Sequence, residues 1–504
     1  MSSPSSRRPA AALGASVASF VVVATVAATP GSPFTPILPA GGGPAGPFRW
    51  VSELVGLDAL EGSALVAVGV AAVAAAAGAF AFVLRQAWLG AIPIRAVVVL
   101  AVVYHVALLS LPLLFSRDVY SYAYYGKIAA IYHANPYVAT PADFPSDELA
   151  AFVGPRWVDT PAVYGPVWTQ ISSLVVRLVD GVAAMILAFR VLAVAASLGV
   201  VAVVARVVGR LRPERSAFAI ALVGVNPVVL FQSAGSGHND LLVAFAVVGA
   251  FALLVARRPF AATAALALGT LVKATAAVPL LLFVVADVAS RRRGERLPAA
   301  LRHVGVAAGL AVVAAAPFLT TRDPSLGMLE LATHEGWLAP SRFFRRLLDA
   351  VSGDVLGFVP RIVFPLLLVG VVLVLVRALV RRAPVSSGTH GASWGWGLLA
   401  VMLLGPVLLP WYVTWVLPLV WLLPFVPRTT AIATGMALTV SQWTSEPARF
   451  ATAYDVNILF GHYVVTPVVT GLLVWLLVDL RRRVRSGLQL EDAPHHVSAA
   501  AGDR

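Results

Sequence analysis

The 504-residue chain contains no cysteine and little charge: charged residues make up 12% of it, and hydrophobic residues make up 59%. Soluble domains carry about twice that share of charged residues. The lack of cysteine excludes disulfides, thiolate metal sites and a cysteine nucleophile. The lack of charge excludes a soluble globule or a disordered chain of this length. The composition, with a mean hydropathy of +0.86, therefore indicates a polytopic membrane protein.

The net charge of +13 does not indicate nucleic-acid binding, because the arginines stand in short clusters between apolar runs. A helix needs about 20 mostly apolar residues to cross a membrane. Twelve runs fit single spans: 12–29, 60–84, 94–115, 183–205, 216–234, 240–256, 303–320, 357–376, 395–410, 411–426, 429–445 and 462–480.

Segment 260–289 is different because arginines flank both of its ends, at Arg257 and Arg258 before it and Arg291 after it. Basic residues stay on the cytoplasmic side. The segment is therefore expected to be a hairpin of two short helices, with Lys273 at its outer tip. This arrangement predicts an all-α fold with about 14 transmembrane helices in a plasma membrane, and both termini in the cytoplasm.

Residues 1–480 are expected to form one transmembrane domain, and 481–504 a short cytoplasmic tail, so we expect no soluble C-terminal domain. An uncleaved first helix is favoured over a signal peptide, which stays open as the alternative for residues 1–29. The Gly/Pro-rich stretch 30–48 is expected to be an outer linker. Two longer outer segments, 116–182 and 321–354, remain as candidate locations for a catalytic or binding site.

The first outer loop, 116–182, is rich in tyrosine, with five tyrosines between positions 120 and 132. Tyrosine suits both an aromatic belt at the membrane interface and a sugar site. The nearby charges of Arg117, Asp118 and Lys127 favour a site. Residues 164–180 are expected to form an amphipathic helix that lies in the outer interface.

Asp118 follows span 94–115 by three residues. A carboxylate so near the membrane loses solvation, which raises its pKa and suits it to proton abstraction. A solvated turn residue or a helix cap is the alternative.

Lysine is almost absent: Lys127 and Lys273 stand against 35 arginines. A compact ammonium makes a point-charge contact to phosphate. Lys273 inside an apolar hairpin is costly unless it has a partner or snorkels toward headgroups. We expect donor-phosphate binding from Lys273, Arg345 and Arg346. The candidates for sugar or acceptor binding are Arg117, Tyr122, Tyr125, Lys127, Tyr164, His238, Asn239, Asp240, His334 and Glu335.

Several motifs are missing from the sequence: a Walker loop, a dinucleotide-binding glycine pattern, HExxH and DxD. A nucleotide-sugar enzyme that uses a DxD-bound metal is therefore not expected. We predict no cofactor and no metal ligand, and leave a requirement for a divalent metal open.

Short motifs in these segments resemble one family. They are Asp118 to Tyr122 (DVYSY), 135–137 (NPY), 164–166 (YGP), 237–240 (GHND), 271–273 (LVK) and 410–412 (PWY). In order and placement they resemble the polyprenol-phosphomannose-dependent α-1,6-mannosyltransferases of actinobacteria, which belong to the GT-C superfamily of glycosyltransferases and build the lipomannan and related lipoglycans of the cell envelope.

The resemblance implies a multi-span helical fold whose active site faces outward. It implies a polyprenyl-phosphate-mannose donor, a lipid-linked mannan acceptor, and a catalytic aspartate in the first outer loop, which falls on Asp118. An inverting transfer with Asp118 as the general base would follow. Two alternatives stay open: another GT-C enzyme with an arabinosyl donor or a protein acceptor, and a transporter or flippase for a lipid-linked sugar.

Overall fold

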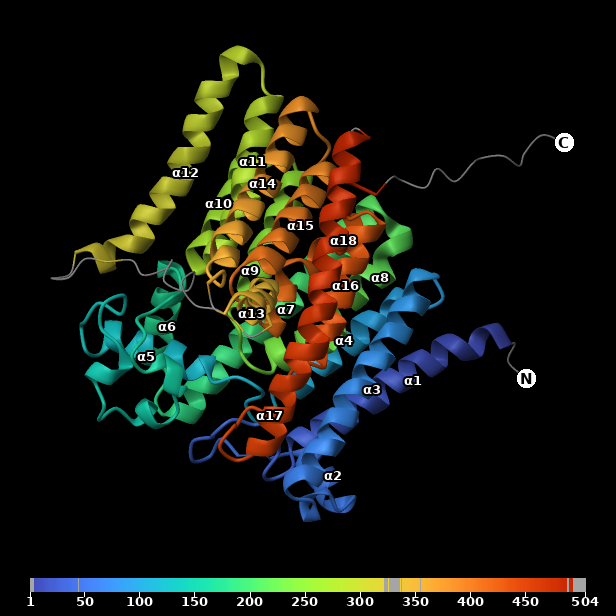
Figure 1. Ribbon diagram of the computed structural model, residues 1–504, viewed down its shortest axis with the longest axis vertical. Helices are drawn as coiled ribbons and strands as arrows, with labels where there is room; N and C mark the ends of the chain where they lie inside the picture. The colour runs from blue at the N-terminus through green and yellow to red at the C-terminus, as the bar shows by residue number, and fades with distance from the viewer. Residues whose placement is uncertain are drawn as a thin grey trace.

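The computed structural model describes residues 4–43, 45–320, 325, 336, 338–353, 355–486 and 489–492, and these residues form helices and connecting loops without a β-strand. Figure 1 shows a bundle of long helices with a smaller group of short helices and loops at one end. The first half of the chain contains α1 (Pro4–Ala27), α2 (Pro47–Leu54), α3 (Gly62–Trp88), α4 (Ile94–Leu108), α5 (Asp118–Ala130), α6 (Pro166–Leu178), α7 (Val182–Leu211), α8 (Ser216–Gly224), the π-helix η6 (Val228–Ala234) and α9 (Asp240–Val255).

The second half continues the bundle. It contains α10 (Pro259–Val272), α11 (Ala277–Ser290), α12 (Arg293–Leu319), α13 (Pro340–Ser352), α14 (Val359–Arg381), α15 (Ser387–Leu404), the 3₁₀-helices η9 (Pro410–Trp415) and η10 (Leu417–Leu422), α16 (Phe425–Thr439), α17 (Ala451–Phe460), the π-helix η11 (Gly461–Val465) and α18 (Thr466–Arg485).

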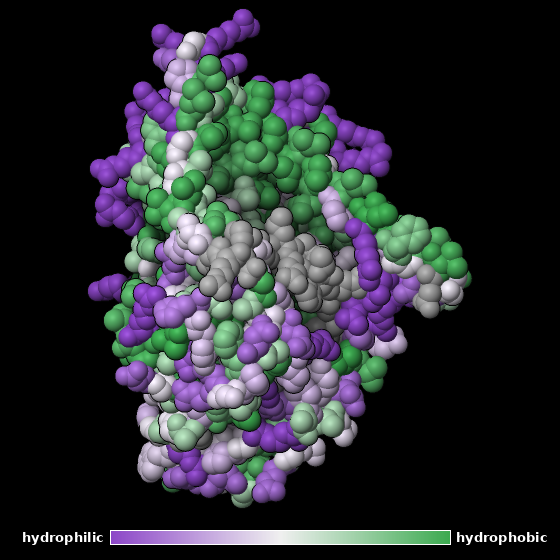
Figure 2. All heavy atoms as spheres, turned by 90° about the vertical axis from the view of Figure 1, so that its left-hand side faces the viewer, coloured by the Kyte–Doolittle hydropathy of each residue, from purple (hydrophilic) through white to green (hydrophobic). Residues whose placement is uncertain are grey.

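Seven helical segments in the described part of the chain are long and apolar enough to cross a membrane: Arg7–Ala27, Gly62–Trp88, Val182–Leu211, Pro213–Ala234, Arg293–Leu319, Val359–Arg381 and Ala451–Arg485. Four shorter apolar helices accompany them, at Ile94–Leu108, Asp240–Val255, Pro259–Val272 and Ala274–Ser290. Figure 2 shows apolar side chains over the upper part of the visible face and mostly polar ones over the lower part. The fold is thus that of a polytopic membrane protein, as the composition predicted.

The hairpin expected over 260–289 is confirmed. The chain leaves helix α10 at Lys273 and re-enters helix at α11. One residue of α12 shows that the two helices lie side by side: the His303 ring contacts the Thr263 hydroxyl near the start of α10 at 2.6 Å and the Asp287 carboxylate near the end of α11 at 3.0 Å. The start of α10 and the end of α11 therefore lie at the same end of the bundle, with Lys273 at the other.

Helix α6 matches the amphipathic helix expected over 164–180. Pro166 occupies its first turn, where a missing N–H costs nothing. Its inward face includes Trp168, Thr169 and Ser172, and it packs on α5. A Cβ on Gly126 of α5 would lie 2.5 Å from the Ser172 carbonyl oxygen, so the two helices approach closely only because residue 126 is glycine.

The span expected over 411–426 differs from the structure. Instead of one α-helix, the chain forms two short 3₁₀-helices, η9 and η10. Pro410 and Pro418 lie in their first turns, and Pro424 precedes α16. Proline lacks the N–H that an α-helix interior requires, so these prolines divide the segment. Residues 411–424 are buried, and this irregular backbone is tolerated because protein surrounds it.

Candidate active site

Asp118 is the first residue of α5, which places its carboxylate at the positive end of the helix dipole. The backbone before it is unusual because Phe115 has a φ of 52°, in the left-handed region that costs a non-glycine residue about 1–2 kcal/mol. Two hydrogen bonds hold this conformation: Phe115 N–H donates to the Phe34 carbonyl, and the Gln442 amide donates to the Phe115 carbonyl. Segments far apart in the sequence therefore fix the start of α5.

A second set of contacts holds Arg117, the neighbour of Asp118. Its guanidinium donates to both carboxylate oxygens of Glu446. The Glu446 carboxylate also accepts from the Ile37 N–H at 2.8 Å, and the Tyr120 hydroxyl donates to the Ile37 carbonyl at 2.6 Å. Arg117 thus ties the start of α5 to the linker and to the loop before α17. We call Arg117, Glu446, Ile37 and Tyr120 the linker clamp.

The turn between η6 and α9 brings His238 to Asp118. Gly237 has a φ of 73°, a conformation that glycine adopts without strain. The His238 Nδ1 atom lies 3.5 Å from the Asp118 carboxylate and 3.4 Å from the Tyr122 hydroxyl. Its ring stacks on Trp411 of η9, with centroids 3.7 Å apart. The imidazole is fully buried, and burial together with the charge of Lys273 lowers its pKa well below the usual value, so it stays neutral.

Lys273 is buried beside Asp240, the first residue of α9. Its ammonium donates to an Asp240 carboxylate oxygen at 2.7 Å, and the Trp415 indole N–H donates to the same oxygen at 2.7 Å. The ammonium also lies 4.5 Å from the centre of the Tyr412 ring. These contacts supply the partner that a buried lysine requires. Lys273 therefore does not snorkel.

Together Asp118, His238, Asp240 and Lys273 form one group, which we call the Asp118 cluster. Burial raises the pKa of Asp118 to about 6, and Asp240 adds to this rise. The charge of Lys273 and the hydrogen bond with Ser116 act in the opposite direction. The cluster therefore holds a carboxylate that is ionised at pH 7 and yet is a stronger base than a solvated aspartate.

Aromatic side chains form one wall of the cluster. The Tyr122 ring makes edge contacts with Tyr164 and with Trp168, at centroid distances of 4.9 and 5.0 Å. The Gly165 N–H donates to the carbonyl of Val272, the residue before Lys273. The 164–166 motif is thereby joined to the hairpin tip. Five of the six motifs noted in the sequence, 118–122, 164–166, 237–240, 271–273 and 410–412, thus meet around Asp118.

Asn239 contributes polar atoms that no described residue uses. Its side chain is fully buried, and both its amide nitrogen and its amide oxygen lack a hydrogen-bond partner among the described residues. The Nε2 atom of His238 and one carboxylate oxygen of Asp240 are also unpaired there. Unpaired buried polar atoms are costly in a finished structure. Four such atoms on three consecutive residues indicate a site that a polar ligand would complete.

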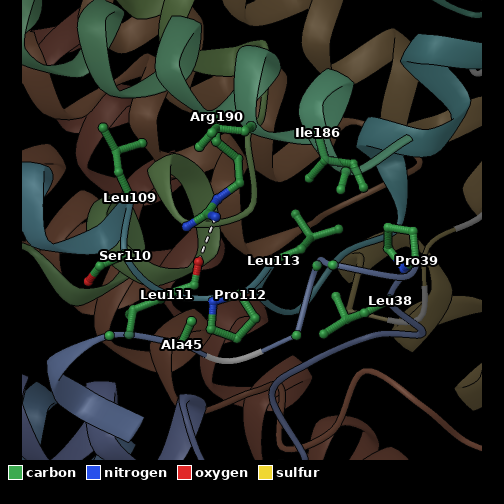
Figure 3. A pocket seen from close by; sticks show the side chains of 16 residues that line it. Leu38, Pro39, Ala45, Leu109, Ser110, Leu111, Pro112, Leu113, Ile186 and Arg190 are labelled. Atoms are coloured by element: carbon green, nitrogen blue, oxygen red, sulfur yellow. Dashed lines mark hydrogen bonds between the residues drawn. The ribbon is translucent and has the colours of Figure 1, made fainter. Parts of the chain in front are cut away.

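Arg190 of α7 supports the turn that carries His238. Its guanidinium is buried and donates to three backbone carbonyls, including those of Gly235 at 3.1 Å and Leu111 at 2.7 Å. Figure 3 shows Arg190 pointing toward Leu111 in a cavity of about 320 Å³. A cation at the carbonyl ends of helices is favourable. This charge within a span therefore fixes backbone beside the cluster.

Three predicted binding residues have contacts of their own. The Tyr125 hydroxyl donates to the Thr160 carbonyl at 2.8 Å, and Arg117 belongs to the linker clamp. Lys127 forms ion pairs with Asp147 and Glu148, both at 3.1 Å. Tyr125 and Lys127 thus hold segment 116–182 together, and Arg117 ties it to the linker.

The predicted binding residues of segment 321–354 either lie on α13 or fall outside the described residues. Arg346 of α13 lies over the ring of Tyr463, 5.4 Å from its centre, and α13 packs on α14 and α18. Arg345 lies on the same helix. His334 and Glu335 fall outside the described residues.

Sequence reasoning missed Trp411, Trp415, Glu446 and Arg190 as partners of the site. The PWY motif entered only through the family resemblance, although an aromatic pair next to a break between two predicted spans indicates a buried polar partner. No local pattern in the sequence indicated a role for Glu446, because its partner Arg117 lies 329 positions away.

Comparison with known proteins agrees with the motifs. The sequence model of the family described as "Alpha-(1->6)-mannopyranosyltransferase, N-terminal domain" matches residues 17–289. Alpha-(1->6)-mannopyranosyltransferase A of Mycobacterium tuberculosis strain H37Rv is 29% identical over 340 residues. The match covers 65% of this chain and 64% of that protein, so just under two thirds of the relative's length is represented. No solved structure matches.

The family match contains all four residues of the Asp118 cluster, from the start of α5 to the hairpin tip at Lys273. It covers more than half of the chain. The resemblance drawn from the short motifs is therefore confirmed, and the chain belongs to the alpha-(1->6)-mannopyranosyltransferase family.

Proposed function

We propose that the chain is an inverting α-1,6-mannosyltransferase that moves mannose from polyprenyl-phosphate-mannose to a lipid-linked mannan acceptor. The observation that carries the proposal is the Asp118 cluster: a partly exposed carboxylate with a raised pKa, next to a buried cation and to unpaired polar groups. Family membership supports mannosyl transfer. The donor, the acceptor and the stereochemistry are proposals of this article.

Asp118 would act as the general base. Its carboxylate would accept the proton of the acceptor 6-hydroxyl while that oxygen attacks the anomeric carbon. A bond would form between the acceptor oxygen and that carbon, and the bond from the carbon to the phosphate oxygen would break with its electron pair. A β-linked donor would then give an α-linked product. Help of this kind is worth about 10²- to 10⁴-fold.

Lys273 would stabilise the departing polyprenyl phosphate, because its charge already acts on the space around Asp118. An ammonium has three N–H donors, and Asp240 accepts one of them. The others would be available to a phosphate oxygen. The requirement is for charge stabilisation rather than for an acid, since a phosphate ester is a good leaving group.

Sugar recognition would come from the buried polar atoms of the turn. The amide of Asn239 offers one donor group and one acceptor, and the Nε2 atom of His238 offers a third polar contact. The ring of Trp411 holds the imidazole in place by stacking. A sugar site built to pair hydroxyls rejects ligands that lack them, because its polar groups would stay unpaired.

The topology proposed here places the Asp118 cluster on the outer face. If η9 and η10 count as one crossing and α17 to α18 as another, the helices would make 14 crossings with both termini in the cytoplasm. The arginine clusters at 206–215, 291–302 and 481–485 then share the cytoplasmic side. A lipid-linked donor accounts for a transferase built largely from membrane helices.

Product formation in detergent micelles tests this function. The purified protein would be incubated with synthetic polyprenyl-phosphate β-mannose and an α-1,6-dimannosyl lipid. An α-1,6-linked product, identified by NMR, is expected from this donor and not from GDP-mannose. A β-linked product, turnover with the nucleotide sugar, or no transfer at all would contradict the proposal, and the last outcome would favour a carrier.

A further inference from the structure

The end of the bundle opposite the Asp118 cluster carries a group of arginines around one tryptophan. Trp88, at the end of α3, lies under two guanidinium groups: that of Arg428 is 4.4 Å and that of Arg215 is 4.9 Å from the ring centre. Residues 216–234, which include α8 and η6, separate this group from His238, and 19 residues correspond to about 28 Å of helix. The group is therefore far from the proposed chemistry.

The residues before the C-terminus hold part of this group. Asp492 forms ion pairs with Arg215 at 2.7 Å and with Arg428 at 3.0 Å, and Glu491 pairs with Arg212 at 3.0 Å. Arg212 and Arg215 are buried by these contacts. Arg428 shares Asp492 with Arg215 and stays partly exposed beside the tryptophan.

An apolar groove runs from this group along the helices. It has a volume of about 430 Å³ and lies between α3, α8 and α16. Leu84, Phe218, Phe425 and Met436 are among its lining residues, together with Arg85 and Arg428. Trp88 and Phe425 are 40% and 62% exposed, which suits contact with lipid and not with water.

Charge decides which lipid the groove suits. Four guanidiniums, those of Arg85, Arg212, Arg215 and Arg428, stand against three carboxylates, those of Glu214, Glu491 and Asp492. The group therefore keeps one positive charge. Exposed Arg85 forms no ion pair with any described residue. One anionic headgroup would complete the group, whereas a zwitterionic one would bring an additional cation.

From the groove and the charge we propose that a single anionic glycerophospholipid binds here, with a chain in the apolar groove and its phosphate at Arg85 and Arg428. The indole of Trp88 would lie at the headgroup level, where tryptophan is favoured. The bound lipid would contact α3, α8 and α16 together at this end of the bundle. The site is independent of the proposed transfer reaction.

Native mass spectrometry and thermal unfolding of the full chain test this inference. Dioleoylphosphatidylglycerol in mixed micelles should raise the Tm to a plateau and leave one lipid bound, while dioleoylphosphatidylcholine should do neither. Arg85→Gln should weaken binding about five-fold, the effect expected from one interfacial arginine. Arg382→Gln removes an exposed arginine outside the groove and should leave binding unchanged.

A second variant tests the groove without a change of charge. Ala81→Trp would place an indole in the groove that Ala81 lines, and should also reduce binding. Equal stabilisation by both lipids, or equal effects of Arg85→Gln and Arg382→Gln, would overturn the proposal. Tighter binding of polyprenyl phosphate than of phosphatidylglycerol would overturn the choice of a glycerophospholipid. None of these readouts depends on mannosyl transfer.

Discussion

The pH dependence of transfer offers a sensitive test of the electrostatics at Asp118. The structure gives its carboxyl a pKa of about 6, against 3.8 for a free aspartate, and this difference disfavours the charged form by about 3 kcal/mol. The base form is lost as the pH falls through this value. Activity should therefore fall on the acid side with a midpoint near pH 6, and about one tenth of the plateau should remain at pH 5.

Lys273→Met perturbs this balance in a known direction. The charge of Lys273 favours the ionised carboxylate, so its removal should make the carboxylate harder to form. The acid limb of kcat/KM should move to higher pH by about one unit, in addition to any loss of rate. At pH 7 the carboxylate would then be about half protonated, compared with about one tenth in the unchanged protein.

The chain supplies a matched control for this experiment. Lys127 is the second lysine, and its ammonium pairs with Asp147 and Glu148 instead of with the Asp118 cluster. Lys127→Met should leave the acid limb in place. An acid limb that stays at the same pH in Lys273→Met, or that moves to lower pH, would refute the claim that Lys273 acts on the base.

Three further predictions concern packing and positioning. Gly126→Ala should lower the Tm and the activity, because the added Cβ forces α5 and α6 apart at a cost of about 1–3 kcal/mol. Gly78→Ala, where a Cβ meets nothing within 4 Å, should lower neither, and equal effects of the two variants on the Tm would contradict the close approach. Glu446→Gln should lower kcat several-fold, because it weakens the linker clamp, and should leave the acid limb of the pH profile in place. Glu53→Gln, at a surface ion pair, should change neither kcat nor the acid limb. A shifted acid limb in Glu446→Gln would assign Glu446 a different role. Asn239→Leu should raise the Tm of the ligand-free protein, because it removes an unpaired buried amide, and should lower turnover at least ten-fold. A lower Tm in circular-dichroism melts would show that the amide has a partner.

Much of the fold follows from periodicity and charge. Arginines on both sides of an apolar run predicted the hairpin around Lys273, and the amphipathic pattern predicted α6. The segment 411–426 was harder, because hydropathy alone does not distinguish an α-helix from 3₁₀-turns. Its prolines indicate that the segment is not one α-helix, since each removes a backbone N–H donor.

The candidate site was predictable in its residues more than in its geometry. The short motifs named Asp118, His238, Asp240 and Lys273, which the structure brings together. The sequence did not predict which of them form pairs, because Lys273 could have faced either a lipid headgroup or Asp240. Glu446 and Arg190 act through backbone and side-chain contacts between distant segments, and such contacts leave no local pattern in one sequence.

The general-base assignment is tested most directly by Asp118→Asn, assayed by single-turnover transfer from polyprenyl-phosphate β-mannose in detergent. The amide keeps the shape of the side chain and cannot accept the proton, so the rate should fall by about 10²- to 10⁴-fold with an unchanged Tm. Asp159→Asn, an exposed carboxylate in the same loop, should retain full activity. A folded Asp118→Asn protein that transfers mannose within a few-fold of the unchanged rate would contradict the account.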